Sequence, residues 1–338
     1  MATPEATARF DGSAYRDFET DGGSLRLSSV GVGTYLGDAN DETDVRYVDA
    51  LTTAFDNGCN VVDTAINYRN QRSERAVGEA FRSTDAGRDE IFVATKGGYI
   101  PFDGDVPENP SAYIREEYVE TGLVPPDETV QANCLAPDFL RSQVEQSLEN
   151  LGVERVDLYY VHNPETHLRE VSGDELEDRL RRAFEALEKE VEAGRVGAYG
   201  VATWNGFRVP EARNDHLSME CVVEAARDAG GEENSLAAVQ IPYNSKMTSA
   251  TTVETQEVGG ERMSALEAAR ELDLYVFTSA ALMQGELAEK RVEEARYGGT
   301  PAQDAIEHAR TTDGVGTALV GMSSVEHVEE NLSFLGEG

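Results

Sequence analysis

The chain alternates short, mostly apolar segments with longer segments in which apolar residues recur at helical spacing. Eight apolar segments have the length of a β-strand and are rich in Val, Ile, Leu and Ala; they cover residues 29–33, 60–64, 91–96, 156–162, 198–202, 237–241, 274–278 and 317–321. Because these segments show little polar alternation, we expect parallel strands that are buried on both faces.

Amphipathic segments follow most of these strands and predict helices over residues 44–57, 73–81, 137–151, 174–193, 217–229, 261–272, 300–310 and 325–335. Gly58, Gly152 and Gly194 each follow a predicted helix, at the place where a residue with positive φ commonly ends one. Strands that alternate with helices predict a parallel sheet. Eight such units predict a (β/α)8 TIM barrel that forms a single domain over residues 1–338.

Two segments fall outside this repeat. Residues 15–18 and 25–27 are strand-like and flank Asp21-Gly22-Gly23, which predicts an N-terminal β-hairpin. Residues 97–136 are far longer than the roughly 2–6 residues usual between a strand and its helix, and residues 113–118 within them could form a short helix. Since this loop follows the third strand, it should lie at the C-terminal ends of the strands. A pocket wall or lid and a surface elaboration both remain open.

Ionisable residues mark the C-terminal ends of three strands. The second strand ends near Asp63, with Tyr68 five positions later; the third ends in Lys96 and the fourth in His162. In a parallel barrel these ends open on one face, where barrel enzymes carry out their chemistry. A phenol next to an ammonium, with a carboxylate and an imidazole around it, can donate a proton. A buried Asp63–Lys96 ion pair with Tyr68 as a packing residue is the alternative, but four such residues in register favour a catalytic site.

These motifs resemble the aldo-keto reductase family over nearly the whole chain. The residues that carry the resemblance are, in order, Asp63-Thr64-Ala65 with Tyr68, Ser73-Glu74 and Gly78; Val93-Ala94-Thr95-Lys96; Asp157-Leu158-Tyr159-Tyr160-Val161-His162-Asn163-Pro164; Gly200-Val201 with Trp204; Gln240 with Tyr243-Asn244; and Glu330-Asn331. Gly31-Val32-Gly33, in contrast, lacks the third glycine and the acidic partner of the phosphate-binding loop in doubly wound folds.

The resemblance implies an NAD(P)(H)-dependent oxidoreductase, such as an alcohol or aldose dehydrogenase. It would transfer a hydride between nicotinamide and an aldehyde, ketone, sugar or alcohol. Tyr68 would be the general acid/base, and His162 would donate a hydrogen bond to the substrate oxygen. Lys96, held by Asp63, would activate Tyr68, because a nearby ammonium favours the phenolate. No metal ion is expected.

By the same resemblance, the cofactor would bind residues from the strand ends and the last helix: Thr34, Asp63, Thr203, Gln240, Thr278, Ser279, Leu282, Met322, Ser323, His327, Glu330 and Asn331. Tyr35 and Trp204 would line the substrate pocket. Thr278 replaces the family's aromatic residue that stacks on the nicotinamide, and Gly321 and His327 stand where many members carry cations for the 2′-phosphate. Because Arg or Lys usually binds that group, the preference between NADP and NAD stays open.

Composition indicates the setting in which the protein works. The chain carries 64 acidic and 29 basic residues, for a net charge of −35. Such a surface repels nucleic-acid phosphates, and it suits a halophilic, archaeal cytoplasm, where molar salt shortens the Debye length to about 3 Å. Three scattered cysteines do not make a disulfide framework. Because no signal pattern or membrane-length apolar run is present, we expect a cytoplasmic monomer or weak homo-oligomer that binds a small substrate, not nucleic acid or a membrane.

Two rival functions remain. A nicotinamide-binding, redox-sensing regulatory module of the potassium-channel β-subunit type would share the fold; slow turnover with tight cofactor retention would favour it. A metal- or carboxylate-dependent barrel hydrolase would need paired carboxylates or histidine clusters at strand ends, and only Asp63 clearly qualifies. His167, His216 and His308 stand alone among polar residues, so we expect them at the surface.

Overall fold

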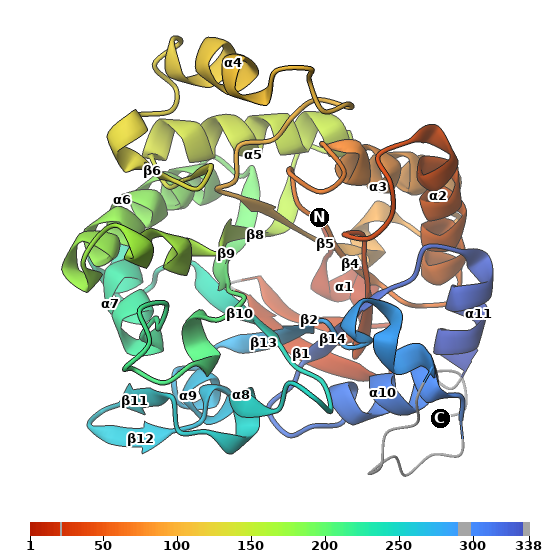
Figure 1. Cartoon of the computed structure of the whole chain (residues 1–338). Helices are drawn as coiled ribbons and strands as arrows, with labels where there is room; N and C mark the ends of the chain where they lie inside the picture. Colours follow the sequence, from red (N-terminus) through yellow and green to blue (C-terminus); the bar gives the residue numbers. More distant parts are fainter. Residues whose placement is uncertain (21, 290–298, 334–338) are drawn as a thin grey trace.

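The computed structural model describes residues 1–20, 22–289 and 299–333. Its centre is a closed barrel of eight strands in the order β10-β13-β14-β3-β4-β5-β8-β9, with helices around it (Figure 1). The barrel strands are β3 (Val30–Gly33), β4 (Val61–Asp63), β5 (Phe92–Gly97), β8 (Val156–His162), β9 (Val196–Ala202), β10 (Leu236–Pro242), β13 (Tyr275–Ser279) and β14 (Thr317–Gly321). Neighbouring strands pair in parallel, and the predicted (β/α)8 barrel is confirmed.

The helices of the described ranges include those packed around the barrel and one near the N-terminus: α1 (Pro4–Thr7), α2 (Asp41–Asp56), α3 (Arg72–Ser83), α5 (Pro137–Leu151), α6 (Gly173–Glu192), α7 (Met219–Gly230), α8 (Ser249–Thr252), α9 (Ala265–Glu271), α10 (Pro301–Arg310) and α11 (Val325–Leu332). Gly152 takes the left-handed conformation (φ 65°) that ends α5, and Thr300 caps the first turn of α10. The predicted helix at 325–335 is α11, and residues 334–335 lie outside the described part. None of the described helices is long and apolar enough to span a membrane.

The helix predicted over residues 261–272 is wrong over its first four residues, 261–264. Residues Gln256–Val258 (β11) and Glu261–Met263 (β12) form an antiparallel hairpin instead. Gly259 and Gly260 form its turn with φ of 59° and 83°, a conformation that glycine adopts without strain. Helix α9 begins only at Ala265, after Ser264 has capped it. The Gly-Gly pair was therefore the stronger local signal.

The N-terminal hairpin closes the bottom of the barrel, as Figure 1 shows behind the strands. Its strands are β1 (Tyr15–Thr20) and β2 (Gly23–Ser28). Phe18 of β1 packs against Phe92 at a centroid distance of 5.1 Å, and Phe92 in turn stacks on Phe277 at 5.9 Å. Tyr160 completes this buried aromatic floor (Phe18, Phe92, Tyr160 and Phe277) in the barrel interior.

Alternation along the strands places the ionisable residues directly above the apolar interior. On β4, Val61 faces the barrel interior, Val62 faces the helices, and Asp63 faces the interior again. The same period of two brings Lys96 of β5 and His162 of β8 to the interior side at their C-terminal ends. The sequence therefore builds one polar layer at the barrel mouth.

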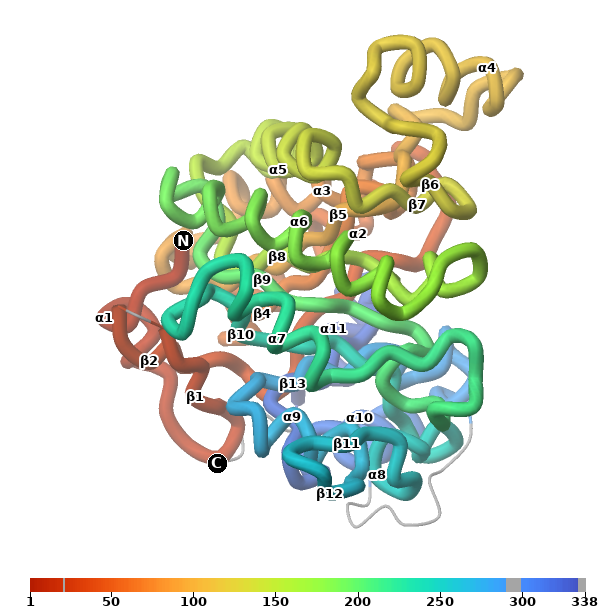
Figure 2. The backbone as a smooth tube through the Cα atoms, turned by 90° about the vertical axis from the view of Figure 1, so that its left-hand side faces the viewer, coloured from red at the N-terminus to blue at the C-terminus, as the bar shows by residue number. Residues whose placement is uncertain are grey.

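The loop at 97–136 projects past α5 at one edge of the molecule (Figures 1 and 2). It contains α4 (Pro110–Ile114), the helical turns η2 (Arg115–Val119) and η3 (Pro126–Glu128), and the short strands β6 (Thr129–Val130) and β7 (Asn133–Cys134). The short helix considered at 113–118 overlaps α4 and η2. Ile100, Val124 and Cys134 form a small apolar cluster with Phe139 of α5, separate from the main core.

Candidate active site

A cleft of about 720 Å³ opens at the C-terminal ends of the barrel strands. Its walls include Asp63, Tyr68 and His162. Lys96 is fully buried behind them and donates hydrogen bonds to Asp63 Oδ2 (2.6 Å) and Tyr68 Oη (3.2 Å). A third bond from its Nζ goes to the carbonyl of Thr64 (2.8 Å). The structure therefore brings together the four residues at the predicted strand ends, here called the tetrad (Asp63, Tyr68, Lys96 and His162).

The surroundings of Tyr68 decide its protonation. Burial, reinforced by the charge of Asp63, raises the pKa of Tyr68 well above its usual value of 10.0. Burial also lowers the pKa of Lys96, although the adjacent Asp63 carboxylate opposes that shift. Tyr68 is therefore a protonated phenol throughout the neutral range. Lys96 does not make it a phenolate in the resting protein; the ammonium can stabilise the phenolate as the proton leaves.

His162 is a neutral imidazole beside this phenol. Burial and the charge of Lys96 lower the pKa of His162 well below its usual 6.5. The rings of Tyr68 and Tyr99 pack edge-on against it, with centroids 5.8 and 5.1 Å away. Asn133 Nδ2 donates to the backbone carbonyl of His162 (2.8 Å) and ties this strand end to the loop at 97–136. A neutral imidazole can donate one hydrogen bond to a substrate oxygen.

Asp63 is held at both carboxylate oxygens. Oδ2 accepts from Lys96, and Oδ1 accepts from Gln240 Nε2 at 2.7 Å. Gln240 is the residue that the family resemblance assigns to the cofactor carboxamide, and it lines the cleft. It therefore links the expected cofactor wall to the ion pair behind Tyr68.

Most of the residues expected to bind a cofactor line one wall of the cleft: Asp63, Thr203, Gln240, Ser279, Leu282, Ser323, His327, Glu330 and Asn331. Thr203 and Asn331 are almost fully buried, and within the described ranges Thr203 Oγ1 and Asn331 Oδ1 have no hydrogen-bond partner. Because buried polar atoms are nearly always paired in proteins, these groups fit a wall that receives a polar ligand. The backbone N–H groups at the start of α11 favour a phosphate nearby. The donor set therefore fits a nicotinamide dinucleotide.

Three of the expected cofactor contacts lie behind the cleft wall instead: Thr34, Thr278 and Met322. Phe277 belongs to the aromatic floor, so its neighbour Thr278 faces the helices. Met322 packs in the core between strands and helices. Thr34 supports the site indirectly, since its Oγ1 donates to the backbone carbonyl of Asp63 (3.2 Å). Phe277 lies too deep in the barrel to replace the missing aromatic contact.

Two aromatic residues expected in the substrate pocket flank the open side of the cleft. Tyr35 is 56% exposed and Trp204 is 46% exposed, and both line the cleft. The buried carboxylate of Glu165 accepts hydrogen bonds from the backbone N–H groups of Trp204 (2.8 Å) and Asn205 (3.1 Å). The loop that carries the indole is therefore anchored to the end of β8.

Several polar residues of the wall were not anticipated: Asn67, Tyr99, Asn163 and Gln284. Asn67 and Asn163 are next to tetrad residues in the sequence, so the motifs that identified the tetrad could also have predicted that these two residues line the cleft. Tyr99 depends on the path of the loop at 97–136 and could not be inferred locally. It is the single residue of this loop that lines the cleft, so the rest of the loop lies outside the cleft wall.

The expectation that His167 lies at the surface is wrong. The side chain is fully buried; its Nε2 is 3.0 Å from Asn133 Oδ1, and its Nδ1 is 3.0 Å from the guanidinium of Arg179. Burial and Arg179 lower the pKa of His167 to about 4, so the ring is neutral. Through Asn133, this network supports the backbone of His162 from outside the cleft.

A second hollow, of about 860 Å³, lies at the opposite end of the barrel beneath the N-terminal hairpin. Its lining includes Arg16, Phe18 and Tyr275, but none of the tetrad. The chemistry described above therefore belongs to the smaller cleft. Among the described residues, no group of three His, Cys, Asp or Glu side chains is placed to hold a metal ion.

Comparison with known proteins agrees with this geometry. The aldo/keto reductase family model matches residues 29–336, and the chain belongs to this family. A D-threo-aldose 1-dehydrogenase of a Pseudomonas species is 33% identical over 45% of the chain, and the NADP(+) aldo-keto reductase yakc of Schizosaccharomyces pombe is 27% identical over 78% of it. The chain spans 42% and 59% of the lengths of these two relatives. A solved aldo-keto reductase of Bacillus halodurans, in its holo form, has the same fold, with a TM-score of 0.62 at 18% identity over 95% of this chain and 90% of its own.

Proposed function

We propose that the chain is an NAD(P)(H)-dependent oxidoreductase that interconverts a carbonyl compound and its alcohol. The observation that carries this proposal is the hydrogen bond between Tyr68 Oη and the buried Lys96–Asp63 ion pair, in the wall of a cleft that also exposes His162. A phenol, an ammonium and an imidazole around one point suit proton transfer to a carbonyl oxygen. A purely structural ion pair would need no open cleft above the phenol.

The cofactor would lie along the wall that carries the unpaired polar atoms. Thr203 and Gln240 would hold the carboxamide, and Glu330 and Asn331 would contact the adenine. When bound, the nicotinamide supplies or accepts the hydride. We propose a weak preference between NADP and NAD, because Gly321 has no side chain and His327 is neither Arg nor Lys, the residues that usually bind a 2′-phosphate.

Tyr68 would donate its proton from Oη to the carbonyl oxygen, while the neutral ring of His162 donates a hydrogen bond to the same oxygen. Lys96 would stabilise the phenolate that forms, with Asp63 holding the ammonium in place. Because the pKa of Tyr68 is raised above its usual value, the phenol holds the proton that carbonyl reduction needs. Alcohol oxidation would first require the phenol to lose its proton.

The substrate would be an uncharged aldehyde, ketone or sugar held between Tyr35 and Trp204. An aldose is a natural first choice, because one relative is named as an aldose dehydrogenase. We also propose that the enzyme works in a halophilic, archaeal cytoplasm as a monomer or weak homo-oligomer; the net charge of −35 supports the high-salt setting.

The experiment is an activity and binding screen in 3 M KCl. NADPH and NADH binding would be followed by fluorescence, and turnover would be measured with 4-nitrobenzaldehyde and a set of aldopentoses and aldohexoses. Turnover that Tyr68→Phe abolishes supports the proposal. Tight cofactor retention without turnover on any carbonyl or alcohol would favour a redox-sensing regulatory module instead, and no binding of either nucleotide would refute both.

A further inference from the structure

Three consecutive residues directly after Tyr68 adopt the left-handed backbone conformation. The φ angles of Arg69, Asn70 and Gln71 are 48°, 56° and 71°, and none of the three is glycine. This conformation is disfavoured for residues with a side chain, so such a run persists only where its surroundings hold it. Strained backbone of this kind tends to occur at functional sites.

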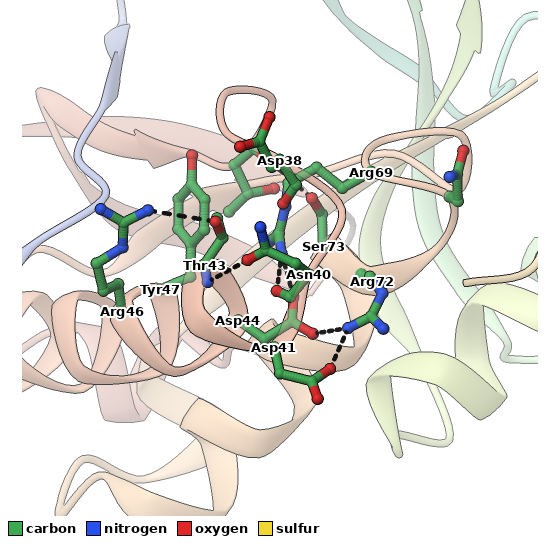
Figure 3. Close-up of polar contacts among 12 residues, drawn as sticks. Asp38, Asn40, Asp41, Thr43, Asp44, Arg46, Tyr47, Arg69, Arg72 and Ser73 are labelled. Carbon is green, nitrogen blue, oxygen red and sulfur yellow. Dashed lines mark hydrogen bonds and ion pairs between the residues drawn. The ribbon is translucent and has the colours of Figure 1, made fainter. Parts of the chain in front are cut away.

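The guanidinium of Arg69 provides many of the contacts that keep this strained segment in place. Its side chain is only 2% exposed and pairs with the carboxylate of Asp44. Its Nε donates to the carbonyl of Asp38 (3.0 Å), and its Nη2, which also bonds Asp44, donates to the carbonyl of Asn40 (3.5 Å). It also lies over the ring of Tyr47 at 5.1 Å. Figure 3 shows Arg69 among these residues of the β3–α2 loop and α2.

Other contacts extend this network. Arg72 joins Arg69 on the Asp44 carboxylate and also pairs with Asp41 at 2.9 Å (Figure 3). On the opposite side, Asn70 and Gln71 donate to backbone carbonyls at the start of the loop at 97–136. The strained run is therefore fixed to two different loops at the cleft mouth.

The β3–α2 loop, which Arg69 fixes, also reaches the cleft. It carries Tyr35, whose ring packs edge-on against Tyr68 at a centroid distance of 5.0 Å. Tyr47 Oη donates to the carbonyl of Leu36 (2.8 Å), the next residue. Tyr68 is thus restrained by its covalent neighbour Arg69 and by a ring from the loop that Arg69 binds.

We infer that Arg69 is a positioning residue that holds Tyr68 Oη against Lys96 by locking the strained segment 69–71 to the β3–α2 loop. The inference rests on the proposed role of Tyr68 as the proton donor. Arg69 does not line the cleft, so its effect must pass through Tyr68 and Tyr35. Lysine at this position could keep the charge, but a single ammonium cannot reproduce the planar fork that meets Asp38, Asn40 and Asp44 together.

The test compares Arg69→Met, Arg69→Lys and Asp44→Asn with Arg82→Gln as the control. Arg82 lies on the neighbouring helix α3 and forms an exposed ion pair with Glu79. Reduction of 4-nitrobenzaldehyde by NADPH would be measured in 3 M KCl, with far-UV circular dichroism to establish that each variant is folded. We expect Arg69→Met to lower kcat about 10- to 100-fold with KM and the Kd of NADPH within threefold. Arg69→Lys should recover a small part of kcat, and Arg82→Gln should match the wild type.

Asp44→Asn should lower kcat in the same direction, and the double variant with Arg69→Met should lose no more than the stronger single variant. A folded Arg69→Met with wild-type kcat, or a loss confined to KM or to NADPH affinity, would overturn the inference. Tyr68→Phe separates the two proposals. If it abolishes turnover while Arg69→Met does not affect it, only the positioning role fails; if Tyr68→Phe is fully active, the proposed proton donor is wrong as well.

Discussion

The two ends of the cleft differ in how their buried polar atoms are paired. At the proton-transfer end, Lys96 donates three hydrogen bonds and both carboxylate oxygens of Asp63 accept one. At the cofactor end, within the described residues, Thr203 Oγ1 and Asn331 Oδ1 are buried without partners. The chain therefore fully pairs the Lys96–Asp63 ion pair by itself, whereas the proposed cofactor end is shaped to gain hydrogen bonds from a ligand; among the described residues His162 Nδ1, beside Tyr68, also has no partner and is open to a substrate oxygen. Substitutions at the first end should change turnover, and those at the second should change affinity.

The largest effect is expected from Tyr68→Phe. Removal of the phenol oxygen deletes the proposed proton donor and should lower kcat by at least about 10²-fold, as is usual for lost general acid catalysis. The Kd of NADPH, measured by fluorescence, should stay within about twofold, because Tyr68 belongs to the proton-transfer end. A kcat near that of the wild type on every good substrate would remove this residue from the mechanism.

The pH dependence of kcat should differ between carbonyl reduction and alcohol oxidation. The pKa of Tyr68 is raised well above 10.0, so the acid form persists through alkaline pH, and the pKa of His162 is lowered well below 6.5, so the ring stays neutral in weak acid. Reduction should therefore be nearly constant between pH 6.5 and 9. Oxidation needs the phenolate, and its kcat should rise up to about tenfold per pH unit over that range. Equal profiles in both directions would contradict this assignment.

Gly321→Lys tests the cofactor end. A Cβ at this position would meet Leu36 Cδ1 at 3.2 Å, the tip of a flexible side chain, so the change should be tolerated. One new charge-assisted contact should shift the preference toward NADP by about 1–2 kcal/mol, or roughly 5- to 30-fold in the ratio of Kd values. The kcat with saturating cofactor should not change. A wild-type preference for NADP above about 100-fold would show that other cations already bind the phosphate.

Asn331→Ala should have a smaller effect. The substitution removes the buried side-chain amide, whose Oδ1 has no partner among the described residues. The binding free energy of the cofactor should weaken by about 1 kcal/mol, which raises Kd about fivefold. Isothermal titration with NADPH and NADH would measure this loss. Unchanged affinity for both nucleotides, in a folded variant, would mean that Asn331 does not contact the cofactor.

The smallest effect on turnover is expected from cutting the loop at 97–136, which contributes only Tyr99 to the cleft. Its projecting part holds a small apolar cluster of its own, so it should loosen first when salt is lowered and carboxylate repulsion grows. Limited proteolysis between Gly104 and Gly122 should leave kcat and KM within about twofold. A marked change in substrate range after this cut would make the loop a lid.

The barrel could be predicted because each strand is a short apolar run that is visible locally in the sequence, and because these runs alternate with segments of helical spacing. The helix ends were also local, as Gly152 and Thr300 illustrate. The helix predicted at 261–272 failed because Glu261 to Met263 has helical composition, while the Gly259-Gly260 turn decides the backbone. Local propensity was overridden by turn geometry.

The site could be predicted from residues at strand ends and from motif resemblance, but not where contacts between distant segments decide the position of a side chain. Asp63, Lys96 and His162 follow from the alternation of β4, β5 and β8, but the same alternation turns Thr278 away from the cleft. The burial of His167 could not be read from the sequence, because it depends on partners 12 and 34 positions away along the chain. Contacts between distant segments also determine where Tyr99 lies.

The aromatic floor has a consequence for water and protons. Phe18, Phe92, Tyr160 and Phe277 are each at most 1% exposed and separate the tetrad from the hollow below the barrel. Tyr160 lies within this layer and is fully buried. In the proposed reaction, a proton that Tyr68 gave away would be replaced most directly from the cleft mouth, through the same opening that the product would leave by. The mouth would thus serve both as the exit of the product and as the proton supply for the next turnover.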